Sequence, residues 1–130
     1  MINKASRAVR FVSGSLFALA ALGATGTAIA QTVPLSFVAS PEIYKVIAEN
    51  EQYRVIEVTW KPGQRDQFHS HPMSGGYFLT DCALRYHAPD GKFADGTRTA
   101  GRAFVQPAIP SHSLENIGQS ACKLIMFEPK

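Results

Sequence analysis

The sequence predicts one small all-β domain that follows a short leader segment. Apolar residues recur with a period of two, turn-forming residues interrupt them often, and one long apolar run is confined to the first thirty residues. Roughly seven or eight short strands at this spacing indicate a β-sandwich or a β-barrel.

The leader is predicted to be a secretory signal peptide covering residues 1–30. Three basic residues, Lys4, Arg7 and Arg10, precede an apolar run from Phe11 that ends in Ala28-Ile29-Ala30. A basic start, an apolar middle and a small-x-small end are typical of such peptides, and we expect cleavage after Ala30. The glycines, serines and threonines within the run argue against the alternative, a permanent membrane anchor. We therefore expect a periplasmic or secreted protein consisting of residues 31–130.

The charge of the expected mature chain excludes two classes of partner. The whole sequence has 13 Lys and Arg against 10 Asp and Glu, and three of the basic residues lie in the leader. Residues 31–130 are therefore formally neutral, and one hundred residues suit one small domain. We expect no nucleic-acid partner, and no membrane partner after the leader is removed.

The strands follow from the period-two pattern in chain order. Residues 53–60 alternate inward and outward side chains and stop at Pro62-Gly63, as a half-buried strand does. The segment Ser40 to Glu49 begins like a helix but could also form a hairpin with the next strand, and we favour the hairpin. Further strands are expected at residues 76–80, 83–87, 102–106 and 121–127.

Two cysteines remain in the expected mature chain. In an oxidising compartment, Cys82 and Cys122 could form a disulfide that closes a loop of about forty residues. Since the sequence does not show whether the two Cβ atoms meet, we favour the alternative of two buried, unreactive thiols.

A histidine pair indicates a metal site. Alternate residues of a strand point to the same face, so both rings of His69-Ser70-His71 can reach one ion. Neutral imidazole is a good ligand for transition metals. The same pair near a proline could instead lie on an exposed turn.

Two longer patterns resemble a known family. From Gly63 to His71 the chain reads Gly, five residues, His, one residue, His. From Gly101 to Asn116 it reads Gly, five residues, Pro, four residues, His, three residues, Asn. Together these segments resemble the two signature motifs of the cupins and cover about a third of residues 31–130.

The resemblance implies a single-domain jelly-roll β-barrel that holds a divalent metal. It implies that His69, His71 and His112 are the metal ligands, and that Pro107 and Asn116 shape the chain around the third histidine. Fe(II) is the favoured ion, because three-histidine sites occur among cupin-like oxygenases; Zn, Mn and Ni also fit. Cupins often pair, which makes a homodimer an expectation.

One departure from the pattern concerns the charge of the site. Cupins usually have a glutamate four or five residues after the second histidine, where this chain has Gly75 and Gly76. Without that carboxylate, three neutral imidazoles would leave the ion its full charge and favour an anionic ligand. The carboxylate that cupins usually supply is therefore expected to be absent here.

Two further side chains are candidates for contact with a small-molecule ligand. If Gly75 faces inward, Tyr77 shares its face and could hydrogen-bond a bound ligand, or it could pack in the barrel with its hydroxyl at the rim. If Gly76 faces inward, Phe78 shares that face instead. Gln106 could orient a group near the metal, or it could be an exposed strand residue. His87 is expected at the surface or behind the ligands.

Two functions follow from these expectations. The first is an exported Fe(II)-dependent dioxygenase acting on a small organic substrate, for which no general base is recognisable in the sequence. The second is a non-catalytic, metal-containing module that binds or senses a small ligand, with an organic anion as the expected class.

Overall fold

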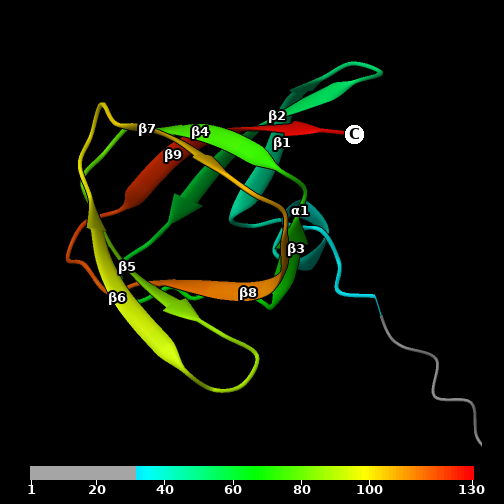
Figure 1. Ribbon diagram of the computed structural model, residues 1–130. Helices are drawn as coiled ribbons and strands as arrows, with labels where there is room; N and C mark the ends of the chain where they lie inside the picture. The colour runs from blue at the N-terminus through cyan, green and yellow to red at the C-terminus, as the bar shows by residue number, and fades with distance from the viewer. Residues whose placement is uncertain (1–31) are drawn as a thin grey trace, which may run out of the picture. The chain divides into compact units, whose positions relative to one another are not determined.

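Two antiparallel β-sheets face each other in the computed structural model, which describes residues 32–130 (Figure 1). The predicted signal peptide lies outside these residues. The larger sheet has the order β1 (Tyr44–Glu49), β2 (Tyr53–Trp60), β9 (Cys122–Pro129), β4 (Ser74–Phe78) and β7 (Ala103–Gln106). The smaller has the order β3 (His69–His71), β8 (Ile109–Asn116), β5 (Cys82–His87) and β6 (Phe93–Arg98).

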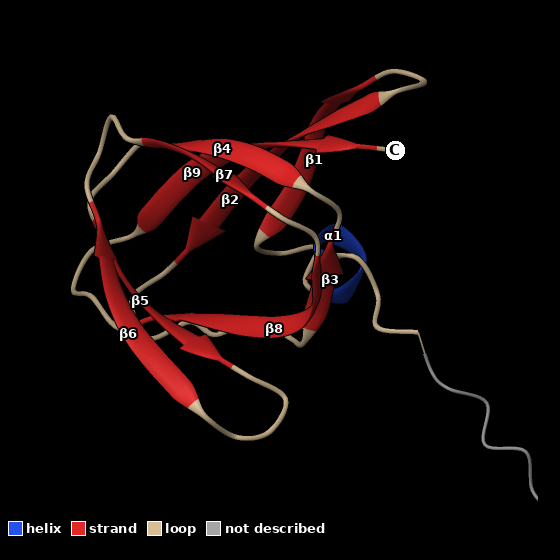
Figure 2. Ribbon diagram, in the orientation of Figure 1, coloured by secondary structure: helices blue, strands red, loops and turns tan. Residues whose placement is uncertain are grey.

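The architecture is the predicted all-β jelly roll, although hydrogen bonds do not join the two sheets into a closed barrel. Figure 2 shows the strands of the two sheets in red and one short helix, α1 (Ser36–Ala39), in blue beside β3. Within residues 32–130, no helix is long and apolar enough to cross a membrane.

Most of the predicted strands are confirmed. The favoured hairpin is present, because β1 pairs with β2 in antiparallel register. The strand expected at residues 76–80 begins and ends two residues earlier, as β4. Strand β6 was not predicted, because its sequence contains mostly small and polar residues and its side chains are largely exposed.

The core lies between the sheets and follows the period-two pattern. On β2 the side chains of Ile56, Val58 and Trp60 are buried, while those between them are more exposed. On β9 the buried positions are Cys122, Leu124, Met126 and Glu128. Glu128 thus occupies one of the alternating buried positions of β9, where a carboxylate is rare unless its charge is paired.

The two cysteines form a disulfide. Cys82 on β5 bonds to Cys122 on β9, with a Cα–Cα distance of 5.0 Å. The bond therefore links the smaller sheet to the larger one. The favoured prediction of two unreactive thiols is therefore wrong, because strand pairing brings the two cysteines together.

Glycines at two motif positions have the conformation expected of them. Gly63 has φ +74° and Gly101 has φ +81°, in the region that residues with a Cβ atom seldom adopt. Asn116 is fully buried, and its side chain accepts a hydrogen bond from the Gly118 backbone and donates to the Trp60 carbonyl. It thus shapes the turn after β8, as the motif implies.

Gly76 is the glycine with the least room for a side chain. It is buried on the inner face of β4, and an added Cβ atom would lie 2.5 Å from the Phe104 ring and 2.8 Å from the Ile125 carbonyl oxygen. We expect Gly76→Ala to lower the free energy of unfolding by about 1–3 kcal/mol through overpacking. Gly75→Ala should cost less, because the added atom meets only the Phe104 carbonyl oxygen, at 3.3 Å. Urea unfolding midpoints of both variants check this, and equal losses would contradict it.

Candidate metal centre

Strand pairing brings the three histidines together. His69 on β3 is the direct cross-strand partner of His112 on β8, and His71 lies two residues further along β3. The register shifts between His69 and His71, so His71 pairs with Ile109. Such a bulge changes where neighbouring side chains point. The ring nitrogens that face one another all lie within 4.8 Å.

Burial keeps two of these rings neutral. Burial lowers the pKa of His69, although the Asp66 carboxylate opposes this. Burial together with the neighbouring His69 and His71 lowers the pKa of His112 to about 3. Both rings therefore carry a lone pair at neutral pH, which is the form that binds a metal ion.

The hydrogen bonds of the cluster fit a cation between the rings. Nδ1 of His69 lies 2.8 Å from the Gln67 carbonyl oxygen, so it can donate there and leave the lone pair on Nε2, which lies 2.9 Å from His71 Nε2 and 3.3 Å from the Tyr44 hydroxyl. Neither ring nitrogen of His112 has a hydrogen-bond partner within residues 32–130, although both are buried. A buried polar atom without a partner is costly, and coordination of an ion would satisfy one nitrogen.

A buried carboxylate stands behind His71. Oε1 of Glu128 lies 2.5 Å from His71 Nδ1, and its other oxygen is buried without a partner among the described residues. Glu128 comes from β9, the strand that pairs with β4, on which Gly76 replaces the usual glutamate. The site therefore has a carboxylate from another strand than the one on which the motif would place it, and this carboxylate contacts the ring of His71.

A second carboxylate supports His69. Asp66 is buried, and its Oδ2 accepts hydrogen bonds from the Tyr44 hydroxyl at 2.7 Å and the Trp60 indole at 3.0 Å. Its Oδ1 accepts from the Leu114 backbone at 2.7 Å and lies 3.6 Å from His69 Nδ1. Burial and the nearby Asp66 raise the pKa of Tyr44 well above its usual value, so Tyr44 stays protonated and donates.

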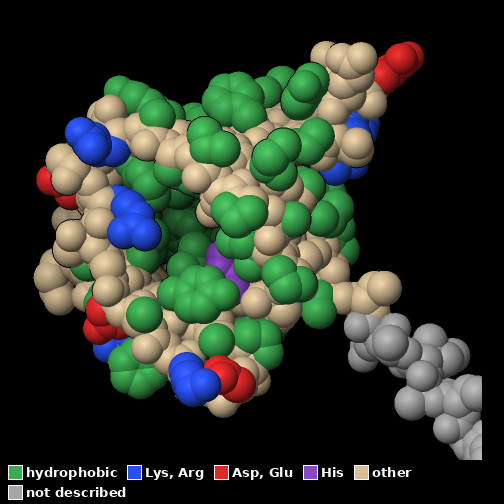
Figure 3. All heavy atoms as spheres, viewed as in Figure 1, with side chains coloured by type: hydrophobic (Ala, Val, Ile, Leu, Met, Phe, Trp, Pro, Cys, Tyr) green, Lys and Arg blue, Asp and Glu red, His purple; other side chains and the backbone are tan. Residues whose placement is uncertain are grey.

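A cavity of about 490 Å³ opens over the cluster, with His71 and His112 in its wall. Figure 3 looks into this hollow, where a histidine is visible among apolar side chains and Lys or Arg side chains border the mouth on one side. The apolar lining includes Trp60, Phe78, Leu84, Phe104, Leu124 and Met126. The cavity therefore offers an apolar space for a small molecule beside the imidazoles.

The other sequence-predicted residues lie in different places. Gln106 lines the cavity, and its amide donates to Ser74 Oγ at 3.0 Å. Tyr77 is half-exposed on the outer face of β4, because Gly76 and Phe78 take the inner face. The structure thus separates Tyr77 from the histidines. His87 pairs with Glu115 at 2.9 Å, apart from the cluster.

Sequence reasoning missed Asp66, Glu128 and Tyr86. Tyr86 is in the cavity lining, and its ring centroid lies 5.2 Å from that of His112. Glu128 could have been found, because it continues the buried alternation of β9 and is its only acidic member. Asp66 lies in a loop without periodicity, and no comparable signal marks it.

The His71–Glu128 pair leads to a specific prediction. We expect Glu128→Gln to weaken metal binding by about 10–100-fold, because a carboxylate that accepts from a ligating imidazole orients the ring and raises its basicity. Glu115→Gln is the matched control, since it alters a His–Glu pair outside the cluster. Competition titration with a metal chelator measures both, and equal affinities would show that Glu128 does not support the site.

The chain is similar in structure to several solved proteins. It matches a cupin domain from Bordetella pertussis with a TM-score of 0.61 and 23% identity, over 77% of this chain and 98% of that one. A double-stranded β-helix protein from Klebsiella pneumoniae gives 0.54 and 20%, over 67% and 75%. The Cnp3 cupin domain of Schizosaccharomyces pombe gives 0.51 and 15%, over 67% and 59%. No protein-family model and no curated protein matches the sequence.

Proposed function

Because this chain has the cupin fold, we propose that it is an exported metal protein that acts on a small organic substrate as an Fe(II)-dependent dioxygenase. The observation that carries the proposal is a cluster of three buried imidazoles, two of which, His71 and His112, line an apolar cavity. Three protein ligands leave coordination positions for other molecules, as catalytic sites do and structural sites do not.

Each part of the site has a defined task in this proposal. His69, His71 and His112 hold the ion, which would supply Lewis acidity and, as iron, the activation of O₂. Glu128 contacts Nδ1 of His71 and so orients the ring, which would leave Nε2 as the ligand atom. The apolar walls bind the substrate and exclude water from it.

Two features support export. The first thirty residues have the pattern of a signal peptide. The Cys82–Cys122 disulfide is stable in the periplasm or outside the cell and is rare in reducing compartments.

One observation favours a second candidate, a module that binds or senses a small ligand without converting it. Asp95 is the one carboxylate among the lining residues in the described part of the chain, and it is paired with Arg85. No carboxylate in the lining is thus free to act as a general base.

Metal analysis and oxygen uptake test the two candidates in sequence. Protein purified from the exported fraction should contain about one transition metal per chain, as measured by elemental analysis. Apoprotein reloaded with Fe(II) should then consume oxygen with at least one member of a panel of thiols, diketones and phenols. Metal binding without oxygen uptake would favour the binding module, and absence of metal binding would overturn both candidates.

A further inference from the structure

We propose that Arg98 is an anion-binding residue of the cavity, and that the ligand is a small carboxylate with an apolar body. The inference rests on the proposed function, because it takes the other end of this ligand to lie at the metal. Arg98 lines the same cavity as His71 and His112. Arg98 lies outside both of the motifs that resemble those of cupins.

Strand register directs Arg98 into the cavity. On β6, Ala94, Gly96 and Arg98 are alternate residues and therefore share one face. Gly96 pairs with Leu84 on β5, and all three of these β6 residues lie in the lining of the cavity together with Leu84. This face of β6 thus borders the cavity, and Arg98, whose side chain is exposed, lies at the cavity mouth.

A glycine leaves room for the arginine to fold back. Nη1 of Arg98 lies 3.0 Å from the place that a Cβ atom on Gly96 would occupy. The guanidinium group therefore lies over Gly96, nearer to the histidines than its own Cα position. A larger residue at position 96 would displace it.

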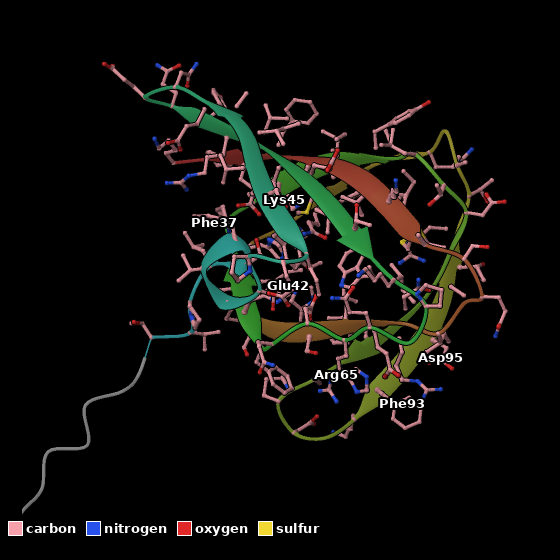
Figure 4. All side chains as sticks on the ribbon, turned by 180° about the vertical axis from the view of Figure 1, so that it is seen from behind. Phe37, Glu42, Lys45, Arg65, Phe93 and Asp95 are labelled. Carbon is pink, nitrogen blue, oxygen red and sulfur yellow. A yellow bond between two sulfur atoms is a disulfide. The ribbon has the colours of Figure 1, made fainter. Side chains whose placement is uncertain are left out.

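Arg98 has no acidic partner among residues 32–130, and its guanidinium donates to the neighbouring Thr97 carbonyl oxygen at 2.8 Å. Asp95, the one carboxylate of the lining, is held by Arg85 through two hydrogen bonds of 2.7 and 2.9 Å. Figure 4 shows Asp95 and Phe93 on the outside of β6. Arg98 therefore keeps its charge and its donors for a ligand.

The spacing along β5 indicates a minimum length for the ligand. Gly96 pairs with Leu84, whereas Tyr86, whose ring contacts that of His112, is two residues further on. Two residues of a strand span about 7 Å. One aromatic ring or a chain of a few carbons fills such a gap, and the apolar wall between suits that body. A carboxylate then reaches the guanidinium, and a donor atom at the far end reaches the metal.

Matched acids and amides test the proposal on the metal-loaded protein. The probes are 4-hydroxybenzoate, 4-hydroxyphenylacetate and 3-(4-hydroxyphenyl)propanoate, whose hydroxyl is the far-end donor, each compared with its primary amide. Trp60 is the single tryptophan of the chain and lies in the cavity wall, so its fluorescence reports binding. We expect at least one acid to bind at least tenfold more tightly than its amide. Arg98→Gln should remove that preference without changing the affinity for the amide.

Further variants separate position from charge. Arg98→Lys should retain part of the preference, and Gly96→Val should weaken acid binding by displacing the guanidinium. Arg102→Gln removes the same charge from an exposed residue outside the lining and should leave binding unchanged.

Three results would overturn the inference while leaving the metal site intact. These are no acid preference in the metal-loaded wild type, no binding of any probe, and an acid affinity that Arg98→Gln leaves unchanged. The last result would place the carboxylate on the metal instead. A wild-type protein that binds no metal would instead overturn the proposed function. Elemental analysis of each sample therefore distinguishes a failure of the Arg98 proposal from a failure of the metal site.

Discussion

Substituting alanine for His112 should reduce metal content from about one ion per chain to near zero after dialysis. His112 is the direct cross-strand partner of His69 and contributes one of three protein ligands. Loss of a ligand should weaken binding by more than the 10–100-fold typical of a residue behind a ligand. Elemental analysis after dialysis against a weak chelator measures the change.

Thermal unfolding gives an independent measure of the same loss. An ion that binds the folded protein but not the unfolded chain stabilises the fold by about 2.7 kcal/mol when its free concentration is a hundred times Kd. Added Zn(II) should therefore raise the unfolding temperature of the wild type but not of the His112→Ala variant. His87→Ala is the matched control, because it removes an imidazole that lies outside the cluster. A His112→Ala protein that still gains stability from Zn(II) would remove this residue from the metal site.

Removing the disulfide should cause the largest loss of folding stability. The Cys82–Cys122 bond closes a loop with a sequence separation of 40 residues. For a loop of this length the chain-entropy relation gives about 4 kcal/mol, because the cross-link restricts the unfolded chain. We expect the double variant Cys82→Ser/Cys122→Ser to lose stability of this order in urea unfolding at constant pH.

The reduced wild-type protein is the control for the disulfide. It should unfold near the midpoint of the double-serine variant, since both lack the same restriction. Both sulfur atoms are in buried residues, so the serine hydroxyls add some cost of their own. An unfolding midpoint that is equal in all three proteins would show that the cross-link does not contribute to stability.

The sequence predicted those parts of the fold and site that rest on local alternation. The inward phase of residues 56, 58 and 60 follows directly from the period of two, and so does the shared face of His69 and His71. The partnership of His69 with His112 depends on the register of strands that are far apart in the chain. Only the motif resemblance indicated this partnership, since local periodicity does not encode register.

The remaining parts arise from contacts between distant segments. Strand β6 is held by pairing with β5 rather than by its own apolar side chains, which made it invisible to pattern analysis. Glu128 is 57 residues from His71, and the distance between them depends on the order of strands in the larger sheet. The identity of the metal, export, the dioxygenase activity and pairing into a dimer stay predictions for the experiments above.

The position of β9 has a consequence for the timing of metal uptake. It is last in chain order, yet it lies between β2 and β4 in the larger sheet and brings Glu128 to His71. The chain is synthesised from its N-terminus, so His69, His71 and His112 are all made before this strand. The early chain therefore contains the ligands without the sheet that orders them. We expect the ion to enter after β9 has been inserted, when synthesis of the strand is complete.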